Sequence, residues 1–117
     1  MFNSSLRQLG DALRAKKISS VELTQSYLDR IAKHNPQLNA FITLNPETSL
    51  AQAREADARL ASGKTDALTG IPIAQKDIFC AKGWLTTCGS KMLHNFVSPY
   101  DAHVISQFNN AGAINLG

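Results

Sequence analysis

The sequence predicts an α/β fold in which N-terminal helices are followed by the first strands of a β-sheet. Apolar residues recur at helical spacing in three early segments, residues 5–15, 20–34 and 47–62. Two short apolar runs follow, residues 71–76 and 113–116, and a helical segment over 101–110 lies between them. A strand, a helix and a second strand in this order are typical of a parallel crossover unit.

At 117 residues the chain has the length of one small domain. We expect a helical part over about residues 1–66 and the start of an α/β core over about residues 67–117. Parallel strands are normally covered on both faces, and this chain offers no further layer to cover them. The sequence therefore predicts the N-terminal part of a larger α/β protein.

Composition favours a folded cytoplasmic protein. Hydrophobic residues make up 44% and charged residues 18% of the chain, unlike a disordered protein. No apolar run reaches the roughly 18 residues of a membrane span, and the N-terminus does not resemble a signal peptide. The net charge is only +3, and Lys16-Lys17 is the one basic doublet, so direct nucleic-acid binding is not indicated.

The first two helices carry clear local signals. Leu6, Leu9 and Leu13 share one face of the first helix. Ser19 and Glu22 have the spacing of a capping box, which places the start of the second helix at residue 20.

The second helix is expected to end at Pro36. Strict apolar alternation over residues 38–44 then predicts a strand. In the third helix Glu55 and Arg59 have the spacing of an ion pair, and Gly63 is expected to end the helix.

The stretch from Asp77 to Pro99 lacks regular periodicity, and loops of this length inside compact domains are often functional. Asp101 is expected to cap the following helix. Within the stretch, Ser90 could be proposed as a nucleophile, but a helix N-cap for residues 91–93 is favoured.

Three further patterns favour structural interpretations. Gly112–Gly117 matches the first positions of a phosphate-binding loop, but a helix precedes it, so a helix-to-strand turn is favoured over a nucleotide site. The cysteines and histidines lack the spacing of a metal site, so we expect two reduced thiols and no metal. These residues are Cys80, Cys88, His34, His94 and His103.

Lys76 stands at the end of the apolar run that begins at Ile71. Its position alone favours a solvent-exposed strand end, which is common on natural sheets. The alternative is a lysine held in the interior, where desolvation favours the neutral amine and creates a base. Spacing does not decide between the two.

Five runs resemble the amidase signature family over nearly the whole chain. The main one is residues 68–80 (LTGIPIAQKDIFC), followed by residues 83–93 (GWLTTCGSKML) and 95–102 (NFVSPYDA). Residues 18–24 (ISSVELT) and 38–42 (LNAFI) are similar as well. The resemblance implies a partial amidase-signature fold, with the first strands of a mixed β-sheet flanked by helices.

The resemblance also implies a Ser–cis-Ser–Lys triad, in which Lys76 is the catalytic lysine. A buried neutral lysine of this kind takes a proton from the bridging serine, which activates the nucleophilic serine. The two serines belong to a Gly/Ser-rich segment expected after Gly117. We therefore expect the 117-residue chain alone to be inactive.

Within the family, the runs TTCGSK and PYDA point to glutamine-hydrolysing subunits of aminoacyl-tRNA amidotransferases. This implies a heterotrimer with two further subunits, in which ammonia from glutamine converts Glu-tRNA(Gln) to Gln-tRNA(Gln). The tRNA would be contacted through a partner subunit, and ATP and Mg²⁺ would be used there, with no cofactor in this chain. The alternatives are a stand-alone amidase acting on another amide, and a non-catalytic partner-binding fragment.

Overall fold

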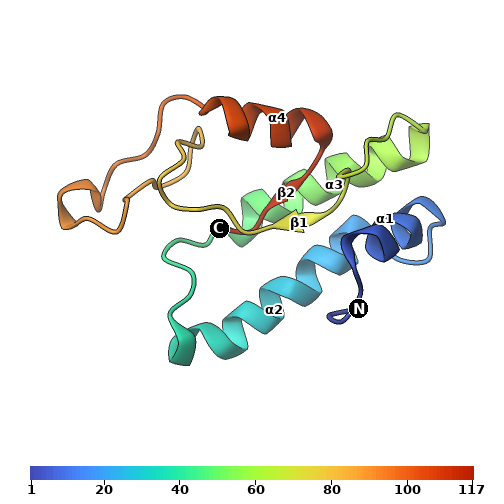
Figure 1. Ribbon diagram of the computed structural model, residues 1–117, viewed down its shortest axis with the longest axis horizontal. Coiled ribbons are helices and arrows are strands. Elements are labelled where there is room, and N and C mark those ends of the chain that lie inside the picture. Colours follow the sequence, from blue (N-terminus) through green and yellow to red (C-terminus); the bar gives the residue numbers. More distant parts are fainter.

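The computed structural model describes residues 1–117, and Figure 1 shows four α-helices around a small sheet. None of the helices combines the length and the apolar character needed to cross a membrane. In chain order the elements are α1 (Leu6–Arg14), α2 (Ser20–Leu38), α3 (Pro46–Ser62), β1 (Pro72–Ile73), the 3₁₀ helix η1 (Lys91–Leu93), α4 (His103–Ala111) and β2 (Ile114–Asn115).

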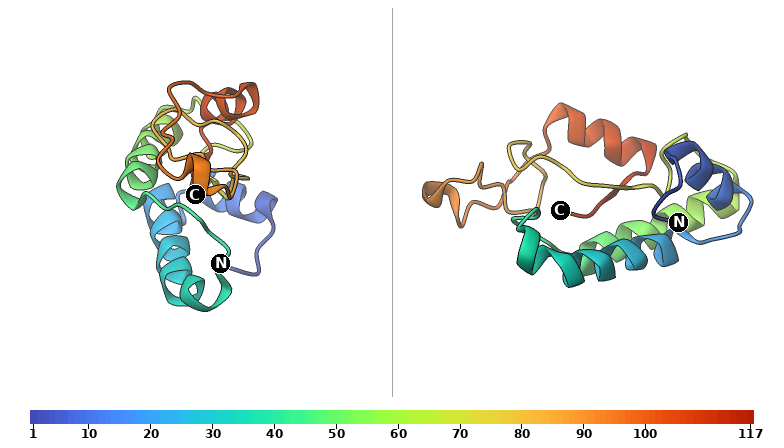
Figure 2. Two further views of the ribbon diagram at one scale, coloured as in Figure 1. Left: turned by 90° about the vertical axis from the view of Figure 1, so that its left-hand side faces the viewer. Right: turned by 60° about the horizontal axis from the view of Figure 1, so that its bottom comes forward.

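β1 and β2 form a two-stranded parallel sheet, with Pro72 opposite Ile114 and Ile73 opposite Asn115. Figure 2 shows α4 on the opposite side of the strands from α2 and α3. The α/β prediction is thus confirmed, with α4 as the connection between parallel strands. The strands are shorter than predicted, although backbone hydrogen bonds extend the pairing from Gly70 to Gln75.

The core forms where α1, α2 and α3 meet the sheet. Leu23 and Ile71 are fully buried and pack in one cluster with Leu13. Ala53 and Ala56 of α3 pack against Ile114 of β2. Small side chains let the helix and the strand approach closely, so α3 anchors the strand that pairs with the lysine-bearing segment.

Local capping explains where the early helices begin. Ser19 and Glu22 form the predicted capping box on α2, and Ser5 and Gln8 form a second one on α1. The Asp57 carboxylate of α3 also accepts hydrogen bonds from the two backbone N–H groups that begin α2, at 2.7 and 3.2 Å. A side chain of α3 therefore fixes the start of α2.

The prediction that Pro36 ends the second helix is wrong, because α2 continues to Leu38. Pro36 removes one backbone donor, but it does so in the exposed last turn, where water can satisfy the freed carbonyl. Asn39 closes the helix in the left-handed conformation, and its N–H donates to the Asn35 carbonyl at 2.7 Å.

The predicted strand over residues 38–44 is also wrong, because this segment is a loop. Instead of pairing with a strand, Phe41 bonds through its backbone N–H and carbonyl to the Asn35 side chain. Phe41 and Leu44 pack against the cluster around Leu28, whereas Ile42 is 63% exposed. The inward residues therefore do not follow the alternation in the sequence.

Two predicted polar contacts are replaced by others. Glu55 and Arg59 form no ion pair, since the Arg59 guanidinium instead donates to the Asn110 carbonyl at the end of α4. Asp101 is not the N-cap of α4, which is Ala102 without a side-chain hydrogen bond. The Asp101 carboxylate accepts from the Lys82 backbone N–H at 2.7 Å. Both side chains find partners on other elements.

Candidate active site

Lys76 lies three residues beyond β1, in the segment that leaves the sheet. The Gln75 N–H donates to the Gly117 carbonyl at 2.9 Å, so the backbone is tied to the end of β2 just before the lysine. The Lys76 carbonyl accepts from the Phe79 N–H at 3.1 Å and opens a turn. Lys76 therefore stands where the chain passes from sheet to loop.

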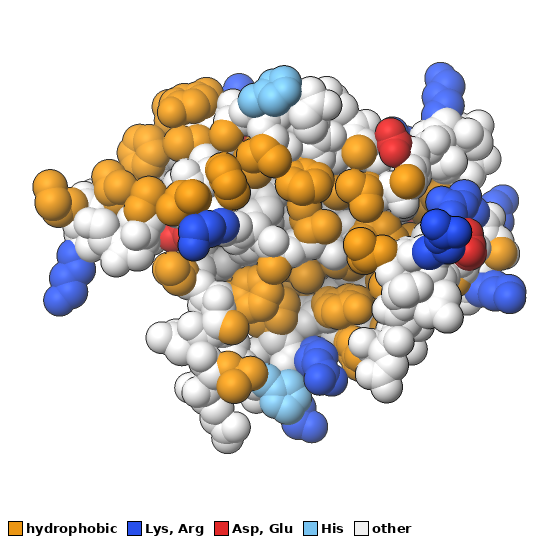
Figure 3. Space-filling model, in the orientation of Figure 1, with side chains coloured by type: hydrophobic (Ala, Val, Ile, Leu, Met, Phe, Trp, Pro, Cys, Tyr) orange, Lys and Arg blue, Asp and Glu red, His pale blue; other side chains and the backbone are white.

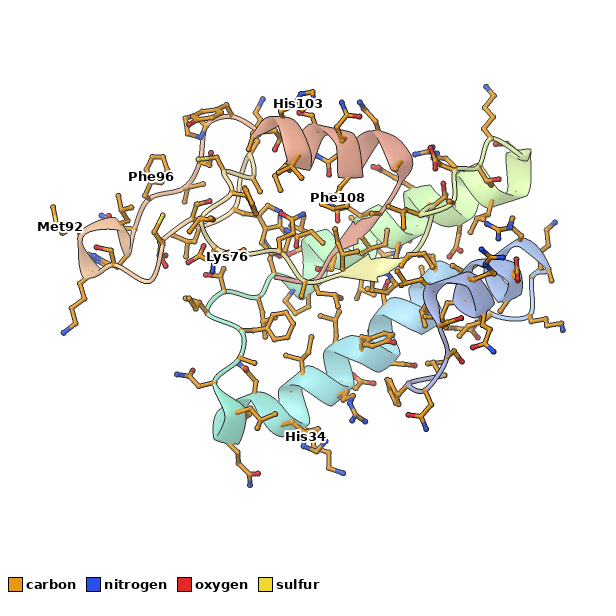
Figure 4. The ribbon with its side chains drawn as sticks, in the orientation of Figure 1. His34, Lys76, Met92, Phe96, His103 and Phe108 are labelled. Atoms are coloured by element: carbon orange, nitrogen blue, oxygen red, sulfur yellow. The ribbon has the colours of Figure 1, made fainter.

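The lysine lines a pocket of about 480 Å³. Its walls come from residues 40–43 after α2, from Asn115 of β2 and Gly117, and from several residues of the segment between 74 and 89. Figure 4 shows Lys76 on the segment that follows β1, near the loop after α2. The pocket thus brings together three parts of the chain that are far apart in sequence.

The Lys76 side chain is exposed in this chain. The chain's one salt bridge joins Arg14 and Asp11, so Lys76 is paired with no carboxylate. The family resemblance implies a buried lysine in a complete family member, and that burial stays a prediction.

Asp77, the next residue, is hydrogen-bonded to the turn at residues 87–89, which contributes to the pocket wall. Its carboxylate accepts from the Thr87 backbone N–H at 3.0 and 3.1 Å, and from the Thr87 hydroxyl. Its backbone carbonyl accepts from the Cys88 N–H at 2.8 Å. The Gly89 N–H donates to the Thr87 hydroxyl oxygen at 3.2 Å. The backbone N–H groups of residues 87–89 therefore all donate either to Asp77 or to the Thr87 hydroxyl oxygen.

The other residues singled out in the sequence have structural roles or lie apart. Ser90 is the N-cap of η1, and its hydroxyl accepts from the Met92 N–H at 3.2 Å, as predicted. Gly112 ends α4 with φ of 77°, so the Gly112–Gly117 segment is a helix-to-strand turn. Cys80 and Cys88 are free thiols, and Cys88 lines the pocket beside Lys76.

The histidines do not converge on one site. His34 lies on α2, His103 begins α4 and His94 follows η1, and Figure 4 shows His34 and His103 at opposite sides of the molecule. No three side chains of metal-ligating type come together.

Two side chains outside the pocket have shifted pKa values. Hydrogen bonds from the Ser19 backbone N–H and hydroxyl lower the pKa of Glu22. Contact with the Cys80 thiol, 3.6 Å from the phenol oxygen, raises the pKa of Tyr100. Neither residue lines the pocket around Lys76.

Sequence patterns alone miss the partnership of Asp77 with Thr87. The two residues are ten positions apart in a stretch without periodicity, and no local rule pairs an Asp with a distant Thr. The contact becomes evident only in the structure, where Thr87 is polar yet only 7% exposed, and buried polar groups need partners.

The model of the Amidase family matches residues 22–117, which covers most of the chain and the whole pocket. The chain belongs to the amidase family.

Curated relatives match this chain over its full length. The A subunit of glutamyl-tRNA(Gln) amidotransferase from Methylobacillus flagellatus is 68% identical over 117 residues, or 100% of this chain and 24% of that protein. Its counterpart from Nitrosospira multiformis is 65% identical with the same coverage. The chain therefore spans about a quarter of the length of the curated relatives it matches.

Solved amidases share the fold of this family member. The peptide amidase of Stenotrophomonas maltophilia matches with a TM-score of 0.90 and 35% identity over 98% of this chain and 24% of that one. An amidase family protein of Bacillus anthracis matches with a TM-score of 0.90 and 30% identity over 98% of this chain and 23% of that one. The α/β arrangement with its parallel strand pair is thus that of an amidase.

Proposed function

We propose that this chain is the N-terminal part of the glutamine-hydrolysing subunit of a Glu-tRNA(Gln) amidotransferase, with Lys76 as its proton-transferring base. The observation that carries the proposal is the position of Lys76. It follows the buried residue Ile71 and β1 and lines the pocket, within the run shared with the amidase family. The identity of 68% to an amidotransferase subunit, against 35% to a peptide amidase, favours the amidotransferase over a stand-alone amidase.

In the proposed mechanism the neutral Lys76 amine accepts a proton from a bridging serine. That serine in turn takes the proton of the nucleophilic serine, whose oxygen attacks the amide carbonyl of glutamine. Backbone N–H groups stabilise the oxyanion. The protonated lysine returns the proton through the bridging serine to the amide nitrogen, the C–N bond breaks, and ammonia leaves. Water then hydrolyses the acyl-enzyme to glutamate and regenerates the nucleophilic serine.

The two serines of this mechanism are not among the residues described, so they would come from the remainder of the subunit. The same remainder would cover the pocket, because a lysine serves as a base when burial favours its neutral form. It would also continue β1 and β2 into a mixed sheet. In this proposal residues 1–66 are the helical part and residues 67–117 the beginning of the α/β core.

The proposed assembly is a cytoplasmic heterotrimer. Ammonia released at this subunit would reach a partner that uses ATP and Mg²⁺ to activate the glutamate of Glu-tRNA(Gln), and the partner would hold the tRNA. This chain would bind no cofactor of its own.

The decisive experiment replaces the lysine in the complete subunit, assembled with its partners. We expect Lys76→Ala to lower glutamine hydrolysis about 10²–10⁴-fold, the range for a lost proton-transfer group. Lys82→Ala is the matched control, because Lys82 is an exposed lysine on the same segment that does not line this pocket. The readout is ammonia released from glutamine, together with the melting temperature of each variant.

Two results would contradict the proposal. Lys76→Ala with the same rate as Lys82→Ala would rule the lysine out as the base. A stand-alone amidase would be favoured by two observations together. The subunit without its partners would hydrolyse other amides, and the assembled complex would show no ATP-dependent conversion of Glu-tRNA(Gln). The 117-residue chain alone should release no more ammonia than its own Lys76→Ala variant.

A further inference from the structure

The segment after β1 places a second polar residue directly beside the proposed base. Asp77 follows Lys76, and both line the same pocket. Unlike the lysine, Asp77 is partly buried, and both of its carboxylate oxygens accept hydrogen bonds. The proposed chemistry gives this carboxylate no role in proton transfer, so its contacts need another explanation.

The contacts of Asp77 all reach one turn of the chain, residues 87–89. Thr87, which is 7% exposed, donates both its N–H and its hydroxyl to the carboxylate. Cys88 donates its N–H to the Asp77 carbonyl, and Gly89 donates to the Thr87 hydroxyl oxygen. The Thr87 N–H and hydroxyl therefore bind the carboxylate, and the other two N–H groups bind the Asp77 carbonyl and the Thr87 hydroxyl oxygen, so Asp77 and the turn are joined at several points.

The turn at residues 87–89 needs this support because its backbone is unusual. Cys88 has φ of 52° and Gly89 has φ of 67°, so two consecutive residues are left-handed. For a residue with a side chain, this conformation is strained. Charge-assisted hydrogen bonds to Asp77 offset the strain.

The lysine backbone is therefore fastened on both sides. On one side Gln75 is bonded to Gly117 of the sheet, and on the other Asp77 is bonded to the turn. A lysine side chain has four rotatable bonds, and its amine is placed reliably only if its backbone is fixed. Reacting groups must be held to within about 0.5 Å, and a displacement of about 1 Å can lower a rate about 10²-fold.

We propose that Asp77 and Thr87 are positioning residues, whose hydrogen bonds hold Lys76 at the geometry needed for proton transfer. This inference rests on the proposed function, because these hydrogen bonds can affect turnover only if Lys76 is the base. The clamp itself, defined as Asp77 with Thr87 and the N–H groups of residues 87–89, can be tested without any activity.

The first measurement is amide hydrogen exchange in the complete subunit, followed by mass spectrometry of the peptides that cover residues 77–89, which include Lys82. In Asp77→Ala the Thr87 amide should exchange at least about tenfold faster, because its acceptor is gone. Asp101→Ala is the matched control, since Asp101 also accepts from a backbone N–H, that of Lys82, at 2.7 Å. That variant should speed exchange at Lys82 and leave residues 87–89 unchanged. An unchanged Thr87 amide in Asp77→Ala would overturn the clamp.

The second measurement is glutamine hydrolysis by the complete subunit with its partners. Thr87→Val keeps the shape of the side chain but removes the hydroxyl, and we expect kcat to fall about 10–100-fold with KM changed less than about threefold. Thr87→Ser restores the hydroxyl and should recover most of kcat. Asp77→Asn keeps one acceptor oxygen and replaces the other by a donating NH2 group, so its kcat should fall between those of wild type and Asp77→Ala.

The outcomes separate this inference from the proposed function. If Lys76→Ala is inactive but Thr87→Val turns over like Asp101→Ala, positioning by the clamp is wrong and the base assignment stands. A rise in KM with unchanged kcat would also overturn positioning, because it would indicate substrate contact. If Lys76→Ala keeps its rate, the proposed function fails, while the exchange data still decide whether the clamp exists.

Discussion

The helical region, residues 1–63, buries more large apolar side chains than the Lys76 region, residues 74–112. In the helical region, leucines such as Leu13 and Leu23 are almost completely buried. Five large apolar side chains are buried there, Leu9, Leu13, Leu23, Leu28 and Ile31, whereas the Lys76 region buries only Trp84 and Ile105. Each region leaves five such side chains exposed, and Figure 3 shows hydrophobic side chains over the loop between β1 and α4. Those of the Lys76 region are Ile78, Phe79, Met92, Val97 and Tyr100.

This difference shows that different interactions stabilise the helical region and order the candidate site. The helical region is stabilised by apolar packing, which is non-directional and grows with buried area. The Lys76 region is ordered largely by directed hydrogen bonds, such as those of Asp77 and Asp101 to backbone N–H groups. Directed bonds suit a site where the position of one amine matters.

The largest expected effect tests where the stability lies. Leu23→Ala should lower the free energy of unfolding by about 2–5 kcal/mol, because Leu23 is completely buried and truncation leaves a cavity. Met92→Ala, at a side chain that is 90% exposed, should change it by less than about 0.5 kcal/mol. Urea unfolding of the two variants checks this. Equal losses would mean that the Lys76 region carries more of the core than its exposure indicates.

The same difference explains which features could be predicted from the sequence. The helices and their caps depend on residues three or four positions apart, so the Ser19–Glu22 box is evident from spacing. The strand expected over 38–44 failed because the Asn35 side chain takes the backbone groups that a partner strand would need. The apolar alternation over residues 38–44 does not reveal that the Asn35 side chain will bind these backbone groups.

The candidate site was predictable only in part. Lys76 was identified through the resemblance of its flanking residues, since spacing alone favours an exposed strand end, and in this chain it is exposed. The Asp77–Thr87 contact was beyond prediction because it closes a loop of ten residues with no repeating pattern. Tertiary contacts of this kind are set by the fold of both segments together.

An intermediate effect compares the glycines that end α3 and α4. Gly63 and Gly112 both have φ of 77°, so alanine at either position should cost about 1–2 kcal/mol of backbone strain. A Cβ at Gly63 meets nothing within 4 Å, whereas one at Gly112 would lie 2.7 Å from an Arg59 guanidinium nitrogen. Displacing that guanidinium disturbs its hydrogen bond to Asn110, for about 0.5–1.5 kcal/mol more.

Thermal unfolding of Gly63→Ala and Gly112→Ala therefore measures how firmly Arg59 joins α3 to the end of α4. In an Arg59→Ala background, adding Gly112→Ala should cost only about the backbone strain, because no guanidinium remains to be displaced. Equal destabilisation by the two alanines would show that Arg59 moves aside freely. The contact between the helical region and the Lys76 region would then be weaker than its geometry indicates.

The smallest expected effect is confined to the helical region and concerns its two capping boxes. The box on α1 uses Gln8, which is uncharged, whereas the box on α2 uses Glu22. Hydrogen bonds from the Ser19 N–H and hydroxyl, at 2.9 and 3.0 Å, lower the Glu22 pKa from its ordinary value of 4.5. Folding therefore favours the ionised carboxylate.

The direction of the pH dependence is set by that lowered pKa. The stabilisation by Glu22 is fully present above pH 4.5 and is lost as the pH falls through the lower pKa of the folded state. Glu22→Gln keeps the acceptor oxygen but removes the charge, as Gln8 does naturally. Wild type should therefore exceed Glu22→Gln in unfolding free energy near neutrality, and the difference should shrink on acidification. Urea titrations at several pH values measure it, and a constant difference would place the effect in packing rather than in the charge.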